Sequence, residues 1–295
     1  MAVRLILDTD IGTDVDDAWA LALCLASDEI ELVGVTLVHA DIDLRAKIAL
    51  KMLKLAGRAE VGVYKGLSTP ISEGAGVFWG GHEGAGTDFS DVEDLSARDG
   101  AVEFVVDTVE RDPGGVVVCA VGPLTNIAEA IKHSPDAMRK VRGLVIMGTT
   151  FQGEGPEHAA PEHNGCVDPV ATKIVLESGI PARIVGLNVT QRVSVDREDT
   201  RGLPGSGLGG YLAAMTDQYY EIVGRDFTYM HDPLAVATVI DPGLVTTRQM
   251  AAHVRDDGCV AYTAGGLLDV CVDVDVDAFQ KLLISNVCSL TKKGD

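Results

Sequence analysis

Short apolar runs rich in β-branched residues alternate with segments of helical spacing through the first two thirds of the chain. The apolar runs span residues 3–8, 30–38, 60–64, 115–122, 143–148 and 181–187, and the helical segments span 43–57, 101–112, 123–134 and 168–179. Strands that are apolar throughout are buried on both faces, as they are in parallel sheets covered by helices. The pattern predicts an α/β fold with a mostly parallel, doubly wound, Rossmann-like sheet flanked by helices.

The sequence shows no sign of a boundary between domains. No Pro/Ser-rich linker, low-complexity tract or repeat divides it, and its 46% apolar content is enough for one large core. We therefore predict a single domain over residues 1–295. After about residue 240, residues 244–255, 259–264 and 267–283 indicate antiparallel strands and a closing helix. Residues 269–277, DVCVDVDVD, alternate at strand period, which predicts that their aspartates form one solvent-facing strand face rather than a second metal site.

The charge balance limits the partners that such a protein can have. The chain has 24 basic and 44 acidic residues, a formal net charge of −20. A field of this sign repels phosphate backbones and anionic lipids, so we expect no nucleic acid and no membrane partner. Small neutral substrates and metal cations remain compatible with it.

Cysteine usage and the N-terminus both point to a reducing compartment. The six cysteines include no CxxC pair, and several lie in apolar runs, where a free cysteine behaves as a small hydrophobic residue. The first residues run directly into a strand pattern without a signal-peptide profile, and no apolar stretch reaches transmembrane length. We expect reduced thiols and a cytoplasmic protein.

Polar residues follow several of the predicted strands. Asp8 and Asp10 end the first strand, and residues 36–41, 121–126 and 147–150 follow three others. In open parallel sheets the ligand lies in the crevice beyond the carboxyl ends of the strands. These segments are therefore expected to meet at one edge of the sheet.

Five aspartates lie between Asp8 and Asp17. Neighbouring carboxylates cannot all ionise without a large cost in free energy, so such a cluster either retains protons or binds a cation. An oxygen-only donor set suits a hard ion, calcium or magnesium, and calcium tolerates the irregular geometry of a loop better. A solvated acidic loop that caps the following helix explains the residues equally well.

A phosphohydrolase is one alternative. A strand followed by Asp-Thr-Asp resembles the DxD motif of haloacid-dehalogenase-type phosphatases, in which Asp8 would be the nucleophile and magnesium the cofactor. In that family Gly-Thr follows at once, whereas Ile11 intervenes here, and no convincing later lysine and paired-aspartate motifs are present. A non-catalytic nucleoside or ribose binder is the other alternative.

The longer string ILDTDIGTDVDDAWAL, residues 6–21, resembles the N-terminal signature DxDxGxDD of the inosine/uridine-preferring nucleoside hydrolase family. Further similar segments occur in the family's order, among them GGHEGAG, VGPLTNIAEAI, PEHNGCVDPVA and MHDPLAVATVIDP. The resemblance covers nearly the whole chain. It implies a calcium-dependent enzyme that releases a nucleobase and ribose from ribonucleosides, and it implies a homo-oligomer, either a dimer or a tetramer.

The resemblance also implies a metal site. Asp10, Asp17, Asp232 and the carbonyl oxygen of Val121 would be the calcium ligands, and Asp10 would also be the general base for a metal-bound water. This arrangement suits the reaction, because cleavage of an N-ribosidic bond develops positive charge on the ribose and requires an activated water on the opposite face.

The residues implied to serve the substrate are Asp16, Asp41, His82, Glu162, Asn164 and His231. Asp16, Glu162 and Asn164 would hold the ribose hydroxyls, and Asp41 stands where many family members have asparagine. His231 would lie beside the leaving base as a proton donor, and His82 would lie on a mobile loop near the pocket. Without the resemblance, His231 reads as a helix cap and His82 as a surface histidine.

The chain departs from the family pattern at three places. Two extra residues precede the Asp16–Asp17 pair, which leaves Asp14 without an assigned role. Pro156 stands where members tend to have an asparagine that contacts the ribose, and His163 replaces a common aromatic residue. The sequence does not predict which nucleobase is preferred.

Overall fold

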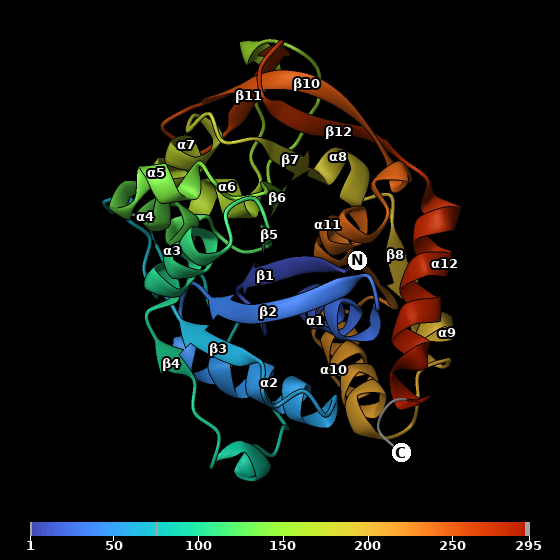
Figure 1. The fold of residues 1–295 in the computed structure, drawn as a ribbon. Coiled ribbons are helices and arrows are strands. Elements are labelled where there is room, and N and C mark those ends of the chain that lie inside the picture. The colour runs from blue at the N-terminus through green and yellow to red at the C-terminus, as the bar shows by residue number, and fades with distance from the viewer. Residues whose placement is uncertain (1, 75, 293–295) are drawn as a thin grey trace.

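The computed structural model describes residues 2–74 and 76–292, and within them ten strands form one sheet (Figure 1). In order across the sheet they are β11 (Val260–Ala264), β10 (Val245–Val254), β12 (Leu268–Val274), β7 (Ala182–Val185), β6 (Gly143–Met147), β5 (Val116–Ala120), β1 (Val3–Thr9), β2 (Ile30–Leu37), β3 (Gly62–Lys65) and β4 (Arg98–Asp99). The strands from β12 to β4 are parallel to their neighbours, and β10 is antiparallel to β11 and β12. The predicted mostly parallel sheet with antiparallel C-terminal strands is confirmed.

The strand order reverses at β1. From β1 the chain builds the sheet in one direction through β2, β3 and β4, and it then returns to add β5, β6 and β7 on the other side. In open α/β sheets the crevice at such a reversal is the place where ligands bind, beyond the carboxyl ends of the strands. The topology therefore places the site next to β1 and β5.

Helices cover both faces of the sheet (Figure 1). One face packs against α1 (Asp16–Ala26), α2 (Ile42–Leu55), α10 (Gly207–Val223), α11 (His231–Ile240) and α12 (Val276–Val287). The other face packs against α3 (Ala101–Arg111), α4 (Thr125–His133), α5 (Pro135–Met138) and α7 (Pro169–Leu176). The four helices expected from sequence spacing form at the expected places, because each carries an apolar stripe that a sheet face can bury.

Strand β1 shows how the two cores are built. Leu5 and Leu7 belong to the core on one face and Ile6 to the core on the other, since successive side chains of a strand point to opposite faces. Helix α1 is buried along all eleven residues. Its first two residues, Asp16 and Asp17, are thereby carried into the interior at the carboxyl edge of the sheet.

Shorter elements complete the chain. They are the helices α6 (His163–Val167), α8 (Leu187–Thr190) and α9 (Arg197–Thr200), a separate antiparallel sheet of β8 (Ser194–Asp196) and β9 (Phe227–Tyr229), and the 3₁₀ turns η1 (Ser90–Val92), η2 (Pro156–His158), η3 (Pro242–Leu244) and η4 (Cys288–Lys292). Helices of about one turn and strands of three residues are too short to show a periodicity in the sequence.

The alternating aspartates near the C-terminus lie on the surface, as expected. Asp273 on β12 is exposed and forms an ion pair with Arg192. The strand ends earlier than the alternation does, because the Asp275 carboxylate accepts a hydrogen bond from the Ala278 amide at 3.0 Å and caps α12. Among the described residues, no helix is both long enough and apolar enough to cross a membrane.

Candidate active site

A cavity of about 350 Å³ opens at the carboxyl ends of the parallel strands. Its carboxylates are those of Asp10, Asp14, Asp16, Asp17, Glu162 and Asp232. Its other lining residues are Thr13, Phe78, Val121, Met147, His163, Asn164, Leu187 and His231. Neither lysine nor arginine lines the cavity within the described part of the chain. The cavity is therefore strongly acidic and suits a neutral ligand or a cation better than a phosphate.

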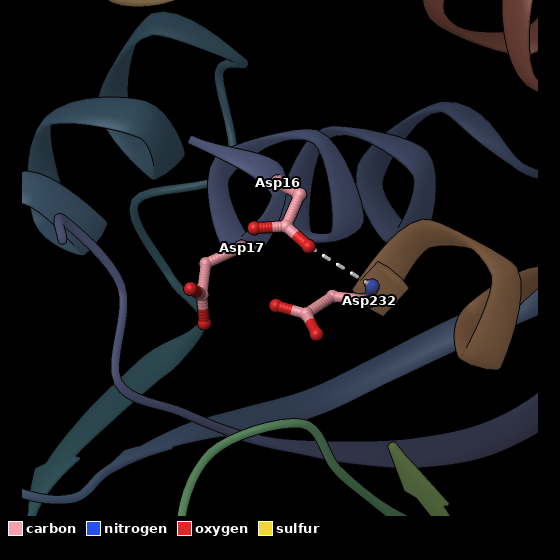
Figure 2. Close-up of side chains that lie close together, drawn as sticks. All are labelled: Asp16, Asp17 and Asp232. Atoms are coloured by element: carbon pink, nitrogen blue, oxygen red, sulfur yellow. Dashed lines mark hydrogen bonds between the residues drawn. The ribbon is translucent and has the colours of Figure 1, made fainter. Parts of the chain in front are cut away.

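Three of these carboxylates form a tight buried cluster (Figure 2). Asp16 and Asp17 begin α1, Asp232 is the second residue of α11, and one oxygen from each lies within 4.8 Å of the others. The backbone amide of Asp232 donates a hydrogen bond to Asp16 Oδ2 at 3.3 Å. The Thr9 hydroxyl donates to Asp17 Oδ1. Packing of α1 against α11 thus brings together residues far apart in the sequence.

The cluster is electrostatically costly without a cation. Burial first, and then repulsion by neighbouring carboxylates, raises the pKa of Asp16 to about 8 and raises the pKa values of Asp17 and Asp232 well above the usual range. A raised pKa means that the ionised form destabilises the folded chain at neutral pH. Within the described residues, none of the three pairs with a lysine or arginine, so an oxygen-liganded divalent cation fits the cluster.

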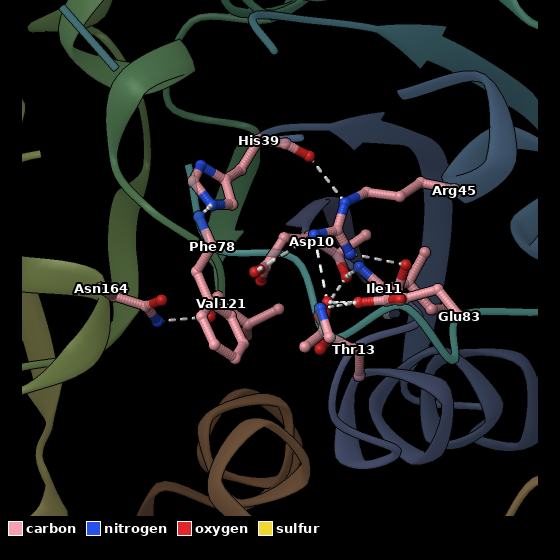
Figure 3. A network of polar contacts seen from close by, with 12 residues as sticks. Asp10, Ile11, Thr13, His39, Arg45, Phe78, Glu83, Val121 and Asn164 are labelled. Atoms are coloured by element: carbon pink, nitrogen blue, oxygen red, sulfur yellow. Dashed lines mark hydrogen bonds and ion pairs between the residues drawn. The ribbon is translucent and has the colours of Figure 1, made fainter. Parts of the chain in front are cut away.

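Asp10 and Val121, in the loops after β1 and β5 (Figure 3), line the same cavity as the cluster. Asp10 contributes to the repulsion that raises the pKa values of Asp17 and Asp232. Gly122 permits its approach, since a Cβ at this position would lie 2.8 Å from Asp10 Oδ1. The four ligands implied by the family resemblance thus line one cavity, although the tightest cluster contains Asp16 in place of Asp10.

Glu162 and Asn164 are held rigidly at the same cavity. The buried Glu162 carboxylate caps α6 and accepts hydrogen bonds from the amides of Thr149, Asn164 and Gly165 at 2.7 to 3.0 Å. The Asn164 side-chain amide donates to the carbonyl oxygen of Val121 at 2.7 Å. This bond links the segment after β6 to the segment after β5.

His231 begins α11 and lines the cavity immediately before Asp232. Its Nδ1 lies 2.7 Å from the Thr190 hydroxyl on α8. Burial lowers the pKa of the imidazole to about 4, so the ring is neutral at pH 7. A neutral ring that accepts from Thr190 through Nδ1 carries its proton on Nε2.

Two of the residues named from the sequence do not line this cavity. Asp41 is exposed and caps α2, accepting a hydrogen bond from the Leu44 amide at 2.9 Å. His82 Nε2 lies 2.8 Å from the Thr13 carbonyl oxygen, and the ring lines a separate small cavity. Asp14, which had no assigned role, does line the main cavity and accepts a hydrogen bond from the Tyr219 hydroxyl at 2.8 Å.

The structure argues against Asp8 as a nucleophile. Its side chain is fully buried, and it accepts hydrogen bonds from the Asn126 amide at 2.8 Å and from the Thr36 hydroxyl. Burial raises the pKa of Asp8 to about 7. Asp8 lies outside the residues that line the cavity and instead connects the ends of β1, β2 and α4. A substrate cannot reach it, so the phosphohydrolase alternative fails.

Three residues near the site, His39, Phe78 and Arg45, match no motif in the sequence. His39 is buried after β2 with φ of +68°, and its Nε2 accepts a hydrogen bond from the Phe78 amide at 3.2 Å (Figure 3). Phe78 lines the cavity, and its ring contacts the His163 ring edge-on with centroids 5.6 Å apart. Arg45 lies behind the loop that carries Asp10. The position of His39 just after a strand was a usable signal, but no pattern marked Phe78.

The sequence profile of one family, described as inosine-uridine preferring nucleoside hydrolase, matches residues 5–281. The chain belongs to this family. Uridine nucleosidase 1 of Arabidopsis thaliana is 31% identical over 274 residues, which cover 88% of this chain and 81% of the relative. The membership makes the chain an N-ribosyl hydrolase, an enzyme that hydrolyses the N-glycosidic bond of ribonucleosides, rather than a non-catalytic binder.

Solved structures agree in fold over nearly the whole length. A purine-preferring ribonucleoside hydrolase from Gardnerella vaginalis has a TM-score of 0.84 and 31% identity, covering 98% of this chain and 99% of its own. The plant nucleoside hydrolase PpNRh1 has a TM-score of 0.86 and 28% identity, covering 98% of this chain and 100% of its own. The Gardnerella enzyme is named for a purine preference, whereas the Arabidopsis relative is named for uridine.

Proposed function

We propose that this N-ribosyl hydrolase depends on calcium and uses Asp10 as the general base that activates the attacking water. The observation that carries the proposal is the buried, oxygen-only cluster of Asp16, Asp17 and Asp232 within the acidic cavity. Asp10, Asp17, Asp232 and the Val121 carbonyl would hold the ion. When bound, calcium would neutralise part of the acidic charge and lower the pKa of a coordinated water.

The cavity residues divide the remaining work. Asp10 accepts the proton of the attacking water, and the surrounding carboxylates stabilise the positive charge that develops on the ribose. Asp16, Glu162 and Asn164 bind the ribose hydroxyls, which selects ribose over deoxyribose because an unmatched buried polar group costs binding energy. In its imidazolium form His231 gives its Nε2 proton to the leaving base and returns to the neutral ring, which keeps its proton on Nδ1 toward Thr190. Asp41 and His82 do not line the cavity, which gives them no direct contact in this scheme.

A ribose-release assay tests the proposal directly. Inosine, uridine, cytidine, adenosine and guanosine are each incubated with the enzyme, with and without a calcium chelator. We expect release of ribose and free base from at least one of them, and loss of release with the chelator that added calcium reverses. Turnover that persists in chelator after verified metal removal would contradict calcium dependence.

Calcium is also expected to stabilise the fold. Ionised Asp16, Asp17 and Asp232 repel one another in the folded chain, and an ion that binds only the native state stabilises it by about 2.7 kcal/mol at a hundredfold excess over the dissociation constant. Calorimetry with and without chelator should show a higher melting temperature with calcium. Asp232→Asn should abolish most of this difference, whereas Asp273→Asn, on the exposed face of β12, should preserve it.

The proposed contacts of Asp16 and Asn164 with the ribose hydroxyls can be tested by substitution. Asp16→Ala and Asn164→Ala should lower kcat/KM by about 10²-fold or more and should narrow the preference for ribose over deoxyribose. Asp273→Asn is the matched control and should change neither quantity, since Asp273 is exposed and pairs with Arg192. Equal losses for all three variants would show that the site lies elsewhere.

We further propose that the chain is one nucleoside hydrolase domain that acts in the cytoplasm as a homo-oligomer, a dimer or a tetramer. The described residues contain no disulfide, and four of the six cysteines are buried, which suits a reducing compartment. Light scattering coupled to size-exclusion chromatography measures the assembly, and a monomer at micromolar concentration would contradict the oligomer.

A further inference from the structure

Arg45 on α2 is fully buried behind the aspartate loop, which we define as residues 10–14. A buried guanidinium is costly unless its donors are satisfied and its charge is compensated. The arginine lies outside the set of residues that line the cavity. Arg45 can therefore affect the cavity only through the residues that it contacts.

The guanidinium joins two loops (Figure 3). Nε donates to the carbonyl oxygen of His39 at 2.7 Å, beyond the end of β2. Nη1 donates to the carbonyl oxygen of Ile11 at 2.8 Å, and Nη2 donates to the Thr13 hydroxyl at 3.3 Å, both in the aspartate loop. Nη2 also lies 3.9 Å from Asp10 Oδ2. The planar fork of arginine matches three acceptors spread in this way, whereas a lysine presents all its donors from one atom.

The same residues anchor the segment 79–83. The Trp79 ring lies 5.2 Å from the guanidinium carbon of Arg45, within cation–π range. The Thr13 hydroxyl donates to Glu83 Oε1 at 2.9 Å, and this oxygen also accepts from the Gly80 amide at 2.7 Å. Glu83 is buried. Arg45 and Thr13 thus hold the aspartate loop on one side and the segment 79–83 on the other.

We propose that Arg45 is a positioning residue, whose fork fixes the direction of the Asp10 carboxylate and docks the segment 79–83 on the aspartate loop. The effect on turnover rests on the proposed role of Asp10, whereas the docking is independent of it. If Arg45 acted through its positive charge alone, a lysine at this position would perform the same role. Under that alternative Arg45→Lys, which keeps a cation beside Asp10, would leave kcat, tryptophan quenching and calcium binding unchanged.

Arg45→Lys separates the two roles, because it keeps the charge and removes the fork. Three quantities are measured: kcat and KM for the best nucleoside, the calcium binding isotherm, and acrylamide quenching of tryptophan fluorescence. Trp19 is fully buried, so quenching reports on Trp79. Arg111→Lys, at a side chain that is 78% exposed, is the matched control.

We expect Arg45→Lys to lower kcat by about 10²-fold with a smaller change in KM, since misplacement of a catalytic group by about 1 Å has this effect. The quenching constant should at least double, and calcium binding should not strengthen. Arg111→Lys should change none of the three. Activity within twofold of the wild type together with unchanged quenching would overturn the proposal, as would tighter calcium binding with unchanged kcat.

Thr13→Val provides a second test if Arg45→Lys does not fold. It removes the hydroxyl that links Arg45 to Glu83 and leaves every charge in place. Increased quenching of Trp79 supports the docking role, and unchanged quenching overturns it. If the chain hydrolysed no nucleoside, the proposed function would fail on its own assay while the quenching measurement would still decide the docking.

Discussion

Asp10→Asn is expected to lower kcat by about 10²- to 10⁴-fold while nucleosides still bind, because asparagine keeps the shape of aspartate but does not accept the proton of the attacking water. Asp10 is suited to this role by its place at the cavity, beside the buried cluster of Asp16, Asp17 and Asp232. Single-turnover ribose release measures the chemical step, and equilibrium binding of the same nucleoside measures affinity. A kcat within tenfold of the wild type would exclude Asp10 as the base.

The same substitution should raise the melting temperature of the metal-free protein. Asp10 contributes to the repulsion that raises the pKa values of Asp16, Asp17 and Asp232. Removal of its charge weakens that repulsion and should therefore increase the free energy of unfolding at neutral pH. Asp273→Asn, which breaks a surface ion pair, is the control and should shift the melting temperature little. A lower melting temperature for Asp10→Asn in chelator would contradict this electrostatic account.

His231→Ala is expected to reduce kcat by about 10²- to 10⁴-fold on natural nucleosides, the range for removal of a proton donor. The imidazole is neutral at pH 7 because burial lowers its pKa to about 4, and its Nδ1 is engaged by Thr190. Proton transfer to the departing base therefore requires the imidazolium form, which gives up its Nε2 proton and keeps its Nδ1 proton toward the Thr190 hydroxyl. Steady-state kinetics with the best nucleoside measures the loss.

The leaving group distinguishes proton donation from a structural role. p-Nitrophenyl riboside releases a group that departs without a proton, so His231→Ala should cost much less on this substrate. His133→Ala, at an exposed histidine on α4, should cost nothing on either substrate. Equal losses on both substrates for His231→Ala would mean that the side chain supports Asp232 or the cavity wall instead.

Asp41 and His39 show where reasoning from sequence reached its limit. The segment of residues 36–41 was expected at the edge of the sheet from its position after a strand, but the sequence analysis selected Asp41 within it. In the structure, Asp41 caps α2, while His39 is buried beside Phe78 with φ of +68°. Which side chain of a loop faces a cavity depends on individual backbone angles, and strand or helix periodicity carries no information about them.

Asp8 and Asp14 illustrate a second limit. Both belong to the same run of five aspartates, yet Asp8 is fully buried behind the sheet edge, and Asp14 is exposed, lines the cavity and bonds to Tyr219. The motif placed all five near the end of one strand. Their different solvent exposure follows from packing of α1, α4 and α10 around them.

Periodicity and short motifs, which are local properties of the chain, were enough to predict the parallel sheet, its flanking helices, the edge at which the site lies and the family. Three features are visible only in the folded chain: Asp232 bonds to Asp16 across 216 positions, Asp8 is buried out of reach, and Arg45 contacts the aspartate loop. These features depend on burial and on contacts between distant segments, and both arise only when the sheet and its helices have packed together.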